Sequence, residues 1–467
     1  MMDIQTLQWL ILIAFGVLFF VLSPKAATTR QFFHAKTKEG NTPTIFLLTS
    51  SLVISWIFAK SIANAANLGM AYGMVGGLAY ACYYLSFLTG GLVIYYMRKK
   101  GRFESIHQFL HSRYGRQAVR LFSLVIGFRL FNEVWSNTTV IGTYFGEQGS
   151  TPFYMAVLTF TFLTLAYTLK GGMRTSLLTD AIQMIFFAVL LFILLFFILP
   201  KSNANAIDYI TSGTWSMEGG VSLLLTVLIQ IFSYPFHDPV LTDRGFISSP
   251  KVTLSSFVAA TVIGFFCILL FSCIGIFAKF EALEGQATVA VSQLLGTVVM
   301  LLMNLIMITS AASTIDSTFS SSSKLLVVDL GKPTWATISR GRLAMILVAV
   351  IGTIPVFLGA DILSATTISG TMVIGLAPVF LFWNRPMPRL SFHLSVWTGI
   401  GVGILLASGQ IPSYLIWFEG KYGDLLSVNI WGTLLCFAGF FLPLFFRKKQ
   451  EPGLINITNE PAAIVQP

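Results

Sequence analysis

The chain has 467 residues, of which 55% are hydrophobic and only 10% are charged, and its formal net charge is +10. Soluble globular proteins carry about 25% charged residues, so this composition excludes an ordinary soluble enzyme or binding domain. Repeated apolar segments of about 18 residues or more predict an all-α, polytopic membrane protein with a single transmembrane domain over residues 1–446. The net charge does not indicate nucleic-acid binding, because most basic residues lie in short loops between the apolar segments.

We expect about 13 membrane spans. In chain order they cover 6–23, 43–69, 74–97, 118–146, 152–169, 175–199, 219–237, 253–278, 290–323, 341–358, 362–383, 390–408 and 426–446. About 24 of the 29 basic residues fall in loops on one side of this arrangement. That side is expected to be cytoplasmic, which places the N-terminus outside and makes residues 447–467 a short cytoplasmic tail.

The second span contains an unusual run of polar side chains, namely Ser55, Lys60, Ser61, Asn64 and Asn67. A lipid-facing helix does not tolerate such a run. It is typical of a discontinuous helix, whose exposed carbonyls and half-helix ends bind ions and solute near the middle of the membrane. Lys60, Ser61 and Asn64 are therefore candidates for a substrate pocket. The alternative is a close helix–helix contact built on the neighbouring alanine and glycine residues.

The fourth span carries Arg129 and Glu133 at membrane depth. They are one helical turn apart, so they are expected to pair. Lys60 is expected to pair with Glu133 or with Asp316 if those helices touch. A free Lys60 would favour a carboxylate-bearing solute, whereas a neutralised Lys60 leaves a neutral polar solute equally open. A charge network that only holds the helices in register is the alternative to a pocket role for Glu133.

Asp180 lies about two turns into the sixth span, after the tight turn at 170–176. We interpret it as a way-station for a departing cation; the alternative is an acid at a helix start, favoured by the helix dipole. In the seventh span Pro235 is expected to break the helix, Tyr234 to cover a site, and Asp238 to begin the inner loop. A second broken span, five helices after the first, predicts inverted repeats over 43–199 and 219–383.

The ninth span ends in a segment packed with hydroxyl side chains, from Thr309 to Asp329. Ser310, Ser313, Thr314 and Ser317 recur at the spacing that places them on one face of a helix. Asp316 lies beside that face, and a carboxylate at membrane depth indicates function. Hard cations such as sodium prefer oxygen ligands, so we expect a sodium site here. The alternative is close helix packing, with each hydroxyl bonded back to its own helix.

Three segments resemble the sodium:solute symporter family, the group of the sodium/glucose, sodium/proline and sodium/sialic acid cotransporters. The first is Gly171-Gly172 followed by Thr179-Asp180-Ala181-Ile182-Gln183; the second is Ser310-Ala311-Ala312-Ser313-Thr314 with Asp329 after it; the third is Tyr234 followed by Arg244. The resemblance extends over about residues 5–446. It implies a LeuT-type fold of five plus five inverted helices, with one extra helix (6–23) before the core and two (390–446) after it.

The resemblance also implies site residues. The main sodium site would use the hydroxyls of Ser313 and Thr314 and the carbonyls of Ser310, Ile54 and Ile57. A second sodium ion, or the exit path of the first, would lie near Asp180, Thr314, Asp316 and Ser317. The sequence departs from the family at Asp316, where a small hydroxyl residue is more usual, and at Lys60, where sugar and proline carriers have no cation.

Together these features predict a multi-pass symporter of the cell membrane that imports a small polar organic solute with sodium by alternating access. The solute pocket is expected to contain Lys60, Ser61, Asn64, Glu133 and Tyr234. A carboxylate-bearing solute (an amino acid, an organic acid or an acidic sugar) is the first expectation, and a sugar or urea the alternative. A proton-coupled carrier and a sensor that kept the transporter fold also stay open. We expect no enzyme activity, because no nucleophile–base or metal constellation is present in the sequence. We also expect no obligatory protein partner.

Overall fold

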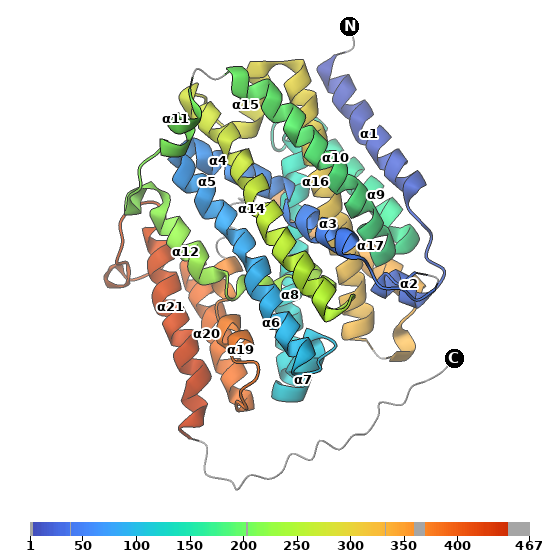
Figure 1. Cartoon of the computed structure of the whole chain (residues 1–467), viewed down its shortest axis with the longest axis vertical. Helices are drawn as coiled ribbons and strands as arrows, with labels where there is room; N and C mark the ends of the chain where they lie inside the picture. Colours follow the sequence, from blue (N-terminus) through green and yellow to red (C-terminus); the bar gives the residue numbers. More distant parts are fainter. Residues whose placement is uncertain (1–2, 38, 202–203, 332, 359–368, 447–467) are drawn as a thin grey trace.

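A computed structural model describes residues 3–37, 39–201, 204–331, 333–358 and 369–446. The chain folds into a bundle of helices that run in both directions through one body (Figure 1). Among the described residues, nine helices are long and apolar enough to cross a membrane, and α3 with α4 forms a further, bent span. The protein is therefore a multi-pass membrane protein by helix length and composition. The predicted number of about 13 spans and the predicted orientation of the termini stay predictions.

The first part of the chain contains ten helices. They are α1 (Ile4–Leu22), α2 (Thr29–His34), α3 (Ile45–Trp56), α4 (Ala59–Tyr72), α5 (Met74–Ala81), α6 (Leu85–Lys99), α7 (Ile106–Tyr114), α8 (Arg116–Gly142), α9 (Thr151–Gly171) and α10 (Met173–Ile198). Helix α8 covers residues 118–142 of the predicted span 118–146. It carries basic and acidic side chains and is not among the nine apolar helices.

The second part is more interrupted. Its helices are α11 (Ala206–Thr211), α12 (Ser222–Gln230), α13 (Pro239–Arg244), α14 (Pro250–Phe280), α15 (Ala287–Leu295), α16 (Thr297–Lys324), α17 (Ile338–Thr353), α19 (Leu376–Leu381), α20 (Arg389–Ser408) and α21 (Gly423–Phe441). The predicted span 290–323 is wrong as a single helix. Gly296 has a φ of +91°, a conformation that favours glycine, and it separates α15 from α16. Residues 362–368 of the predicted span 362–383 lie outside the described residues.

Helix α16 is the most enclosed of the apolar helices. In its most apolar stretch of 18 residues, 72% of the residues are buried inside the protein. The corresponding share is 28% for α1, which lies at the edge of the bundle (Figure 1). Helices α3, α8, α9, α10 and α17 pack around α16. The hydroxyl-rich segment therefore lies in the middle of the protein, away from lipid, where polar side chains can find partners.

Helices α4 and α14 pack backbone to backbone. A Cβ atom added to Gly275 would lie 1.7 Å from the carbonyl oxygen of Ala66, and one added to Gly69 would lie 2.2 Å from that of Ser272. Small residues permit such close contact between membrane helices. The predicted close packing at the small residues of the second span is therefore present alongside its polar residues, and the two interpretations do not exclude each other.

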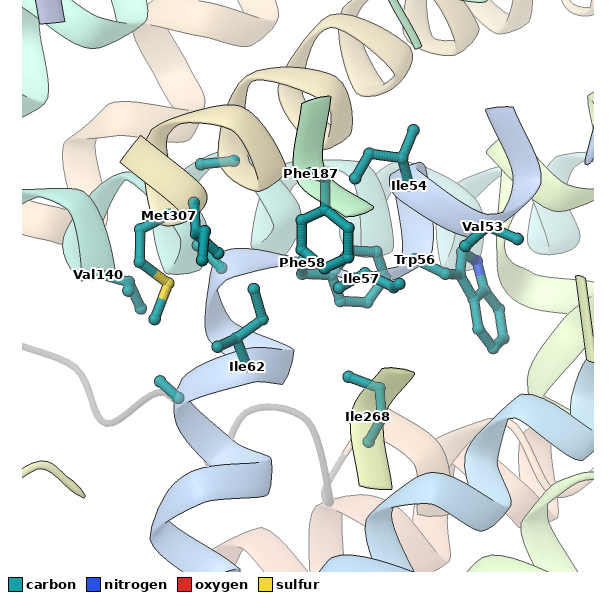
Figure 2. Packing of buried hydrophobic residues seen from close by; sticks show 14 of the residues in the cluster. Val53, Ile54, Trp56, Ile57, Phe58, Ile62, Val140, Phe187, Ile268 and Met307 are labelled. Carbon is teal, nitrogen blue, oxygen red and sulfur yellow. The ribbon is translucent and has the colours of Figure 1, made fainter. Parts of the chain in front are cut away.

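The predicted discontinuity in the second span is confirmed. Helix α3 ends at Trp56 and α4 begins at Ala59, and their axes differ by 57°. Phe58 between them has extended backbone angles. Figure 2 shows apolar side chains packed around this break, among them Phe187 and Met307. The break is thus enclosed by protein, which is the condition for irregular backbone at membrane depth.

The predicted break at Pro235 is also confirmed. Helix α12 ends at Gln230, a short 3₁₀ turn covers Tyr234–His237, and the six-residue helix α13 follows. The prediction that Asp238 begins an inner loop is wrong. Its side chain is buried and accepts a hydrogen bond from the backbone N–H of Leu241 (3.1 Å), so it caps α13 inside the protein.

Candidate functional site

The break between α3 and α4 exposes carbonyl oxygens to the hydroxyl face of α16. The hydroxyl of Thr314 donates to the carbonyl of Ser55 (3.3 Å) and to that of Ser310 (3.0 Å). Within the described residues, the carbonyls of Ile54 and Ile57 accept no hydrogen bond, although both residues are fully buried. Buried carbonyls without partners are costly. These two oxygens are therefore suited to act as ligands of a cation. They are the two carbonyls that the sequence analysis placed in the main sodium site.

The predicted hydroxyl residues of α16 lie together, but their side chains form hydrogen bonds with different residues. Ser313 donates to Oδ1 of Asp180 on α10, whereas the Ser317 hydroxyl is hydrogen-bonded to that of Ser55 (3.0 Å). The Ser310 hydroxyl is buried and has no hydrogen-bond partner among the described residues. Neutral oxygen donors of this kind fit a hard monovalent cation. The donor set therefore fits sodium between α16 and the α3–α4 break.

Two buried carboxylates flank this region. Oδ2 of Asp180 accepts hydrogen bonds from Ser51 (2.5 Å) and, more weakly, from Ser317 (3.4 Å), in addition to the Ser313 contact at Oδ1. Asp180 thus joins α3, α10 and α16, and it lies in contact with Ser313 of the candidate sodium site. The predicted role of Asp180 as a way-station for a departing cation stays a prediction.

The Asp316 side chain faces α9 and α10. It accepts hydrogen bonds from Tyr167 (2.9 Å), Ser176 (2.8 Å) and Thr179 (2.9 Å). No Lys, Arg or His of the described chain forms an ion pair with it within 4 Å. The predicted alternative in which Lys60 pairs with Asp316 is therefore wrong, because Lys60 lies against α8.

Arg244 is a residue of this region whose burial the sequence analysis missed. It lies after Asp238, in the stretch that was expected to be an inner, cytoplasmic loop, yet its side chain is completely buried. Its Nη2 lies 3.6 Å from Oδ2 of Asp180 and donates to Ser176 (3.1 Å) and Ser317 (2.8 Å), while its Nε donates to Ser51 (3.0 Å). Helix α13 carries the guanidinium back into the bundle, so the loop assignment is corrected.

A second charged cluster lies beside the break, between α4 and α8. Nζ of Lys60 is 2.8 Å from Oε1 of Glu133, which is also 2.5 Å from the guanidinium of Arg129. Arg129 in turn lies 3.3 Å from Asp238, and Asn137 donates to the other Glu133 oxygen (2.9 Å). All four charged side chains are buried. The predicted pairs of Glu133 with Arg129 and with Lys60 are both present, and the cluster has two cations and two anions.

The remaining pocket candidates form a polar and aromatic wall next to this cluster. The hydroxyl of Tyr80 is 3.3 Å from both the Ser61 hydroxyl and the Asn64 amide nitrogen. The ring of Tyr83 lies 5.6 Å from that of Tyr80 and 5.1 Å from that of Tyr234. The structure therefore brings Ser61, Asn64 and Tyr234 together, and Tyr80 and Tyr83, which were not predicted, connect them.

Gln230 at the end of α12 completes this wall. Its side-chain oxygen accepts a hydrogen bond from Tyr83 (2.8 Å), and its nitrogen donates to Asn429 on α21 (3.0 Å). Asn429 also donates to Thr371 (3.0 Å). The sequence signal for Gln230 and Asn429 was an amide within an apolar span, and the sequence analysis did not use it.

Residues 39–212 match the model of the sodium:solute symporter family. Among solved structures, the chain is similar to a Na+-coupled sialic acid symporter in a substrate-bound outward-open state, with a TM-score of 0.74 and 13% sequence identity over 96% of this chain and 99% of that chain. No curated protein matches the chain by sequence.

Two further similar structures are of Mhp1, a nucleobase-cation-symport-1 family transporter. One is a closed conformation with bromovinylhydantoin bound (TM-score 0.57, 13% identity, 90% of this chain and 97% of that chain). The other is inward facing (TM-score 0.53, 12% identity, 90% and 96%). At these identities the likeness shows the fold, which is the LeuT-type transporter fold that the sequence analysis expected. These matches are to transporters and not to enzymes, and the resemblance to the symporter family is confirmed over residues 39–212.

Proposed function

We propose that the protein is a sodium-coupled symporter of the cell membrane that imports a small polar organic solute without net negative charge. Support comes from the family match over residues 39–212 and from the donor set between α16 and the α3–α4 break. The two broken spans, α3–α4 and α12–α13, support inverted repeats over 43–199 and 219–383.

Sodium and solute would bind on opposite sides of the same break. On one side Ser313, Thr314 and the free carbonyls of Ile54 and Ile57 offer oxygen ligands. On the other side α4 presents Ser61 and Asn64 to the tyrosine wall. Ligands that favour the same arrangement of one mobile element bind with positive coupling. A potential of 100 mV adds about 2.3 kcal/mol of inward driving force for each sodium ion.

The charge balance beside the break supports a solute without net negative charge. The carboxylate expectation depended on a free Lys60, but Lys60 is buried and paired with Glu133 at 2.8 Å. Arg129 is balanced by Glu133 and Asp238. Moving a carboxylate into this cluster would add an unbalanced buried charge, which is costly. Sugars, polyols, urea and other neutral polar molecules can instead use the hydroxyl and amide groups of Tyr80, Asn64 and Gln230.

Proteoliposomes test this proposal. Purified protein would be reconstituted into liposomes, and a sodium gradient would be imposed across the vesicle membrane. Uptake would then be screened with labelled neutral solutes (sugars, polyols, urea) beside monocarboxylates and acidic sugars. We expect at least one neutral solute to accumulate only under an inward sodium gradient, with matching solute-dependent ²²Na⁺ uptake. Accumulation restricted to anionic solutes would contradict the solute assignment. Solute binding without any flux would instead indicate a sensor, and accumulation under a proton gradient alone would contradict sodium coupling.

A further inference from the structure

Basic side chains gather around a cavity that lies apart from the sodium and solute positions. The cavity has a volume of about 840 Å³ and lies between α2, the end of α6 and the segment that leads into α14 (Figure 1). We call it the basic cavity; its titratable lining residues are Arg30, His34, Lys36, Arg98, Arg102 and Glu104. Basic residues that only set membrane orientation need to lie in a cytoplasmic loop. They do not need to converge from separate segments on one cavity, as these residues do.

The basic cavity carries an excess of positive charge. Four of its cations form no ion pair within 4 Å in the part of the chain that the structure describes, namely Arg30, Lys36, Arg98 and Arg102. With His34 uncharged, these four cations and Glu104 give the lining a net charge of +3. A hollow lined by charges of one sign concentrates ions of the opposite sign. The basic cavity therefore favours an anion.

Arg98 supplies a fixed guanidinium in the basic cavity. Its Nη1 donates to the carbonyl of Gly245 (2.8 Å) and to the hydroxyl of Thr253 (3.0 Å). Its Nη2 donates to the carbonyl of Ser248 (2.5 Å), and its Cζ lies 5.5 Å from the centre of the Phe246 ring. These acceptors are neutral, so the guanidinium keeps its charge, and the bonds use only part of its N–H fork. A guanidinium that is already held in place loses little further freedom when it binds an anion.

We propose that the basic cavity binds the phosphate group of an anionic membrane lipid. Guanidinium groups match the oxygens of a phosphate in a bidentate arrangement, and Arg30, Arg98 and Arg102 all border this cavity. The volume of about 840 Å³ suits an organic head group. It is far larger than a small inorganic anion needs, since one water molecule occupies about 30 Å³ in the liquid. This site goes beyond the proposed function, because it concerns neither sodium nor the solute.

The surroundings of the basic cavity favour a lipid over a soluble phosphate compound. Helix α6 ends and α14 begins at its rim, which places the cavity at the level of the membrane surface. Ile45 and Phe46 begin α3 shortly after the lining residue Thr42, and they are 47% and 56% exposed. Apolar side chains of this kind can contact acyl chains next to a bound head group. Basic pockets between helices on the cytoplasmic side are suited to anionic head groups.

Native mass spectrometry of the full-length purified protein tests the proposal. The probes are dioctanoyl phosphatidylglycerol and dioctanoyl phosphatidylcholine, which share their acyl chains and differ in net charge. We expect the wild type to retain phosphatidylglycerol in preference to phosphatidylcholine. Arg30→Gln/Arg102→Gln removes two exposed cations of the cavity and should weaken phosphatidylglycerol binding about tenfold or more. Arg116→Gln/Arg120→Gln is the matched control, because it removes two exposed cations of α8 outside the lining and should leave binding unchanged.

Three results would overturn the proposal: equal retention of the two lipids by the wild type, unchanged phosphatidylglycerol binding in Arg30→Gln/Arg102→Gln, or an equal loss in both double variants. Glycerol 1-phosphate is the soluble probe, and binding as tight as that of phosphatidylglycerol would contradict a lipid source. Arg98→Gln should also weaken phosphatidylglycerol binding. Because Arg98 anchors the segment before α14, its folding is checked by thermal melting, and the exposed double variant decides if Arg98→Gln does not fold.

Discussion

Nζ of Lys60 on α4 lies 2.8 Å from Oε1 of Glu133 on α8, and both side chains are buried. The same carboxylate oxygen lies 2.5 Å from Arg129. One carboxylate therefore serves two cations beside the break in the second span. Because the three residues come from two helices that flank the candidate pocket, the cluster both fixes the position of α4 and cancels the charge of Lys60.

Glu133→Gln should destabilise the protein more than Lys60→Met does. The glutamine removes the negative charge that pairs with both cations, so Arg129 keeps Asp238 and Lys60 loses its ion pair. Lys60→Met instead leaves Glu133 paired with Arg129. Loss of one partner from a buried ion pair costs about 3–5 kcal/mol. Thermal melting in detergent would show a larger fall for Glu133→Gln, with partial recovery in the double variant Lys60→Met/Glu133→Gln. Equal stability of wild type and both single variants would mean that the cluster is not formed in solution.

Thr314→Ala should weaken sodium binding on the order of tenfold, because loss of a hydrogen-bonding or ligand oxygen near a charge costs about 1.5 kcal/mol or more. The hydroxyl of Thr314 on α16 contacts the carbonyl of Ser55 on α3 and that of Ser310 on its own helix. Ser322→Ala is the matched control on the same helix. Its buried hydroxyl only bonds back to the Thr318 carbonyl at 2.7 Å. Sodium titrations that are equally shifted in both variants would argue against a specific site at Thr314.

Gly275→Ala should disrupt the contact between α14 and α4. The added Cβ would lie 1.7 Å from the Ala66 carbonyl oxygen, and backbone atoms cannot move aside as a side chain can. The expected result is a clear loss of thermal stability together with loss of sodium binding. Gly401→Ala on α20 is the control, because nothing lies within 4 Å of its added Cβ. Similar melting temperatures for the two variants would contradict the close approach of α4 and α14.

The stability of the region around α7 should fall at acid pH through His107. Burial is the main cause that lowers the pKa of His107 below its usual value of 6.5, and Lys324 lowers it further, while Asp329 opposes the shift. A histidine whose pKa is lowered by folding is protonated more easily in the unfolded chain. Its full stability contribution is therefore present above about pH 6.5 and is lost as the pH falls below that value.

Melting temperatures between pH 7.5 and pH 5 check this expectation, because this range brackets the ordinary histidine pKa of about 6.5. His107→Gln should flatten the acid side of the profile, whereas His111→Gln, at an exposed position of the same helix, should leave it unchanged. An acid-side loss of the same size in wild type and His107→Gln would assign the effect to other groups.

Part of this site was accessible from sequence because a membrane penalises exposed polar groups. The polar run in the second span predicted the break between α3 and α4, and the hydroxyl spacing predicted the face of α16. The spacing of Arg129 and Glu133 predicted their pair. The sequence could not predict that Lys60 pairs with Glu133 and not with Asp316, because this depends on how α4 packs against α8.

The short helix α13 explains the main errors. Asp238 precedes the six residues of α13, which begin with Pro239 and end with Arg244. A segment this short has no hydrophobic periodicity to separate a helix from a loop. Basic residues near span ends also favour a cytoplasmic loop. Only the packing of α13 against α3 and α16 brings Arg244 to Asp180. Tyr80 and Tyr83 were missed for a similar reason, since tyrosines in an apolar span carry no distinct signal.

The central claim is that sodium binds between α16 and the break in the second span. Equilibrium binding of radiolabelled sodium to purified protein, wild type beside Ser313→Ala, tests it without knowledge of the solute. The account predicts saturable binding to the wild type and a large loss of affinity in Ser313→Ala, whose hydroxyl contacts Asp180 beside that break. Folded wild-type protein without saturable sodium binding, or equal binding in both proteins, would contradict it.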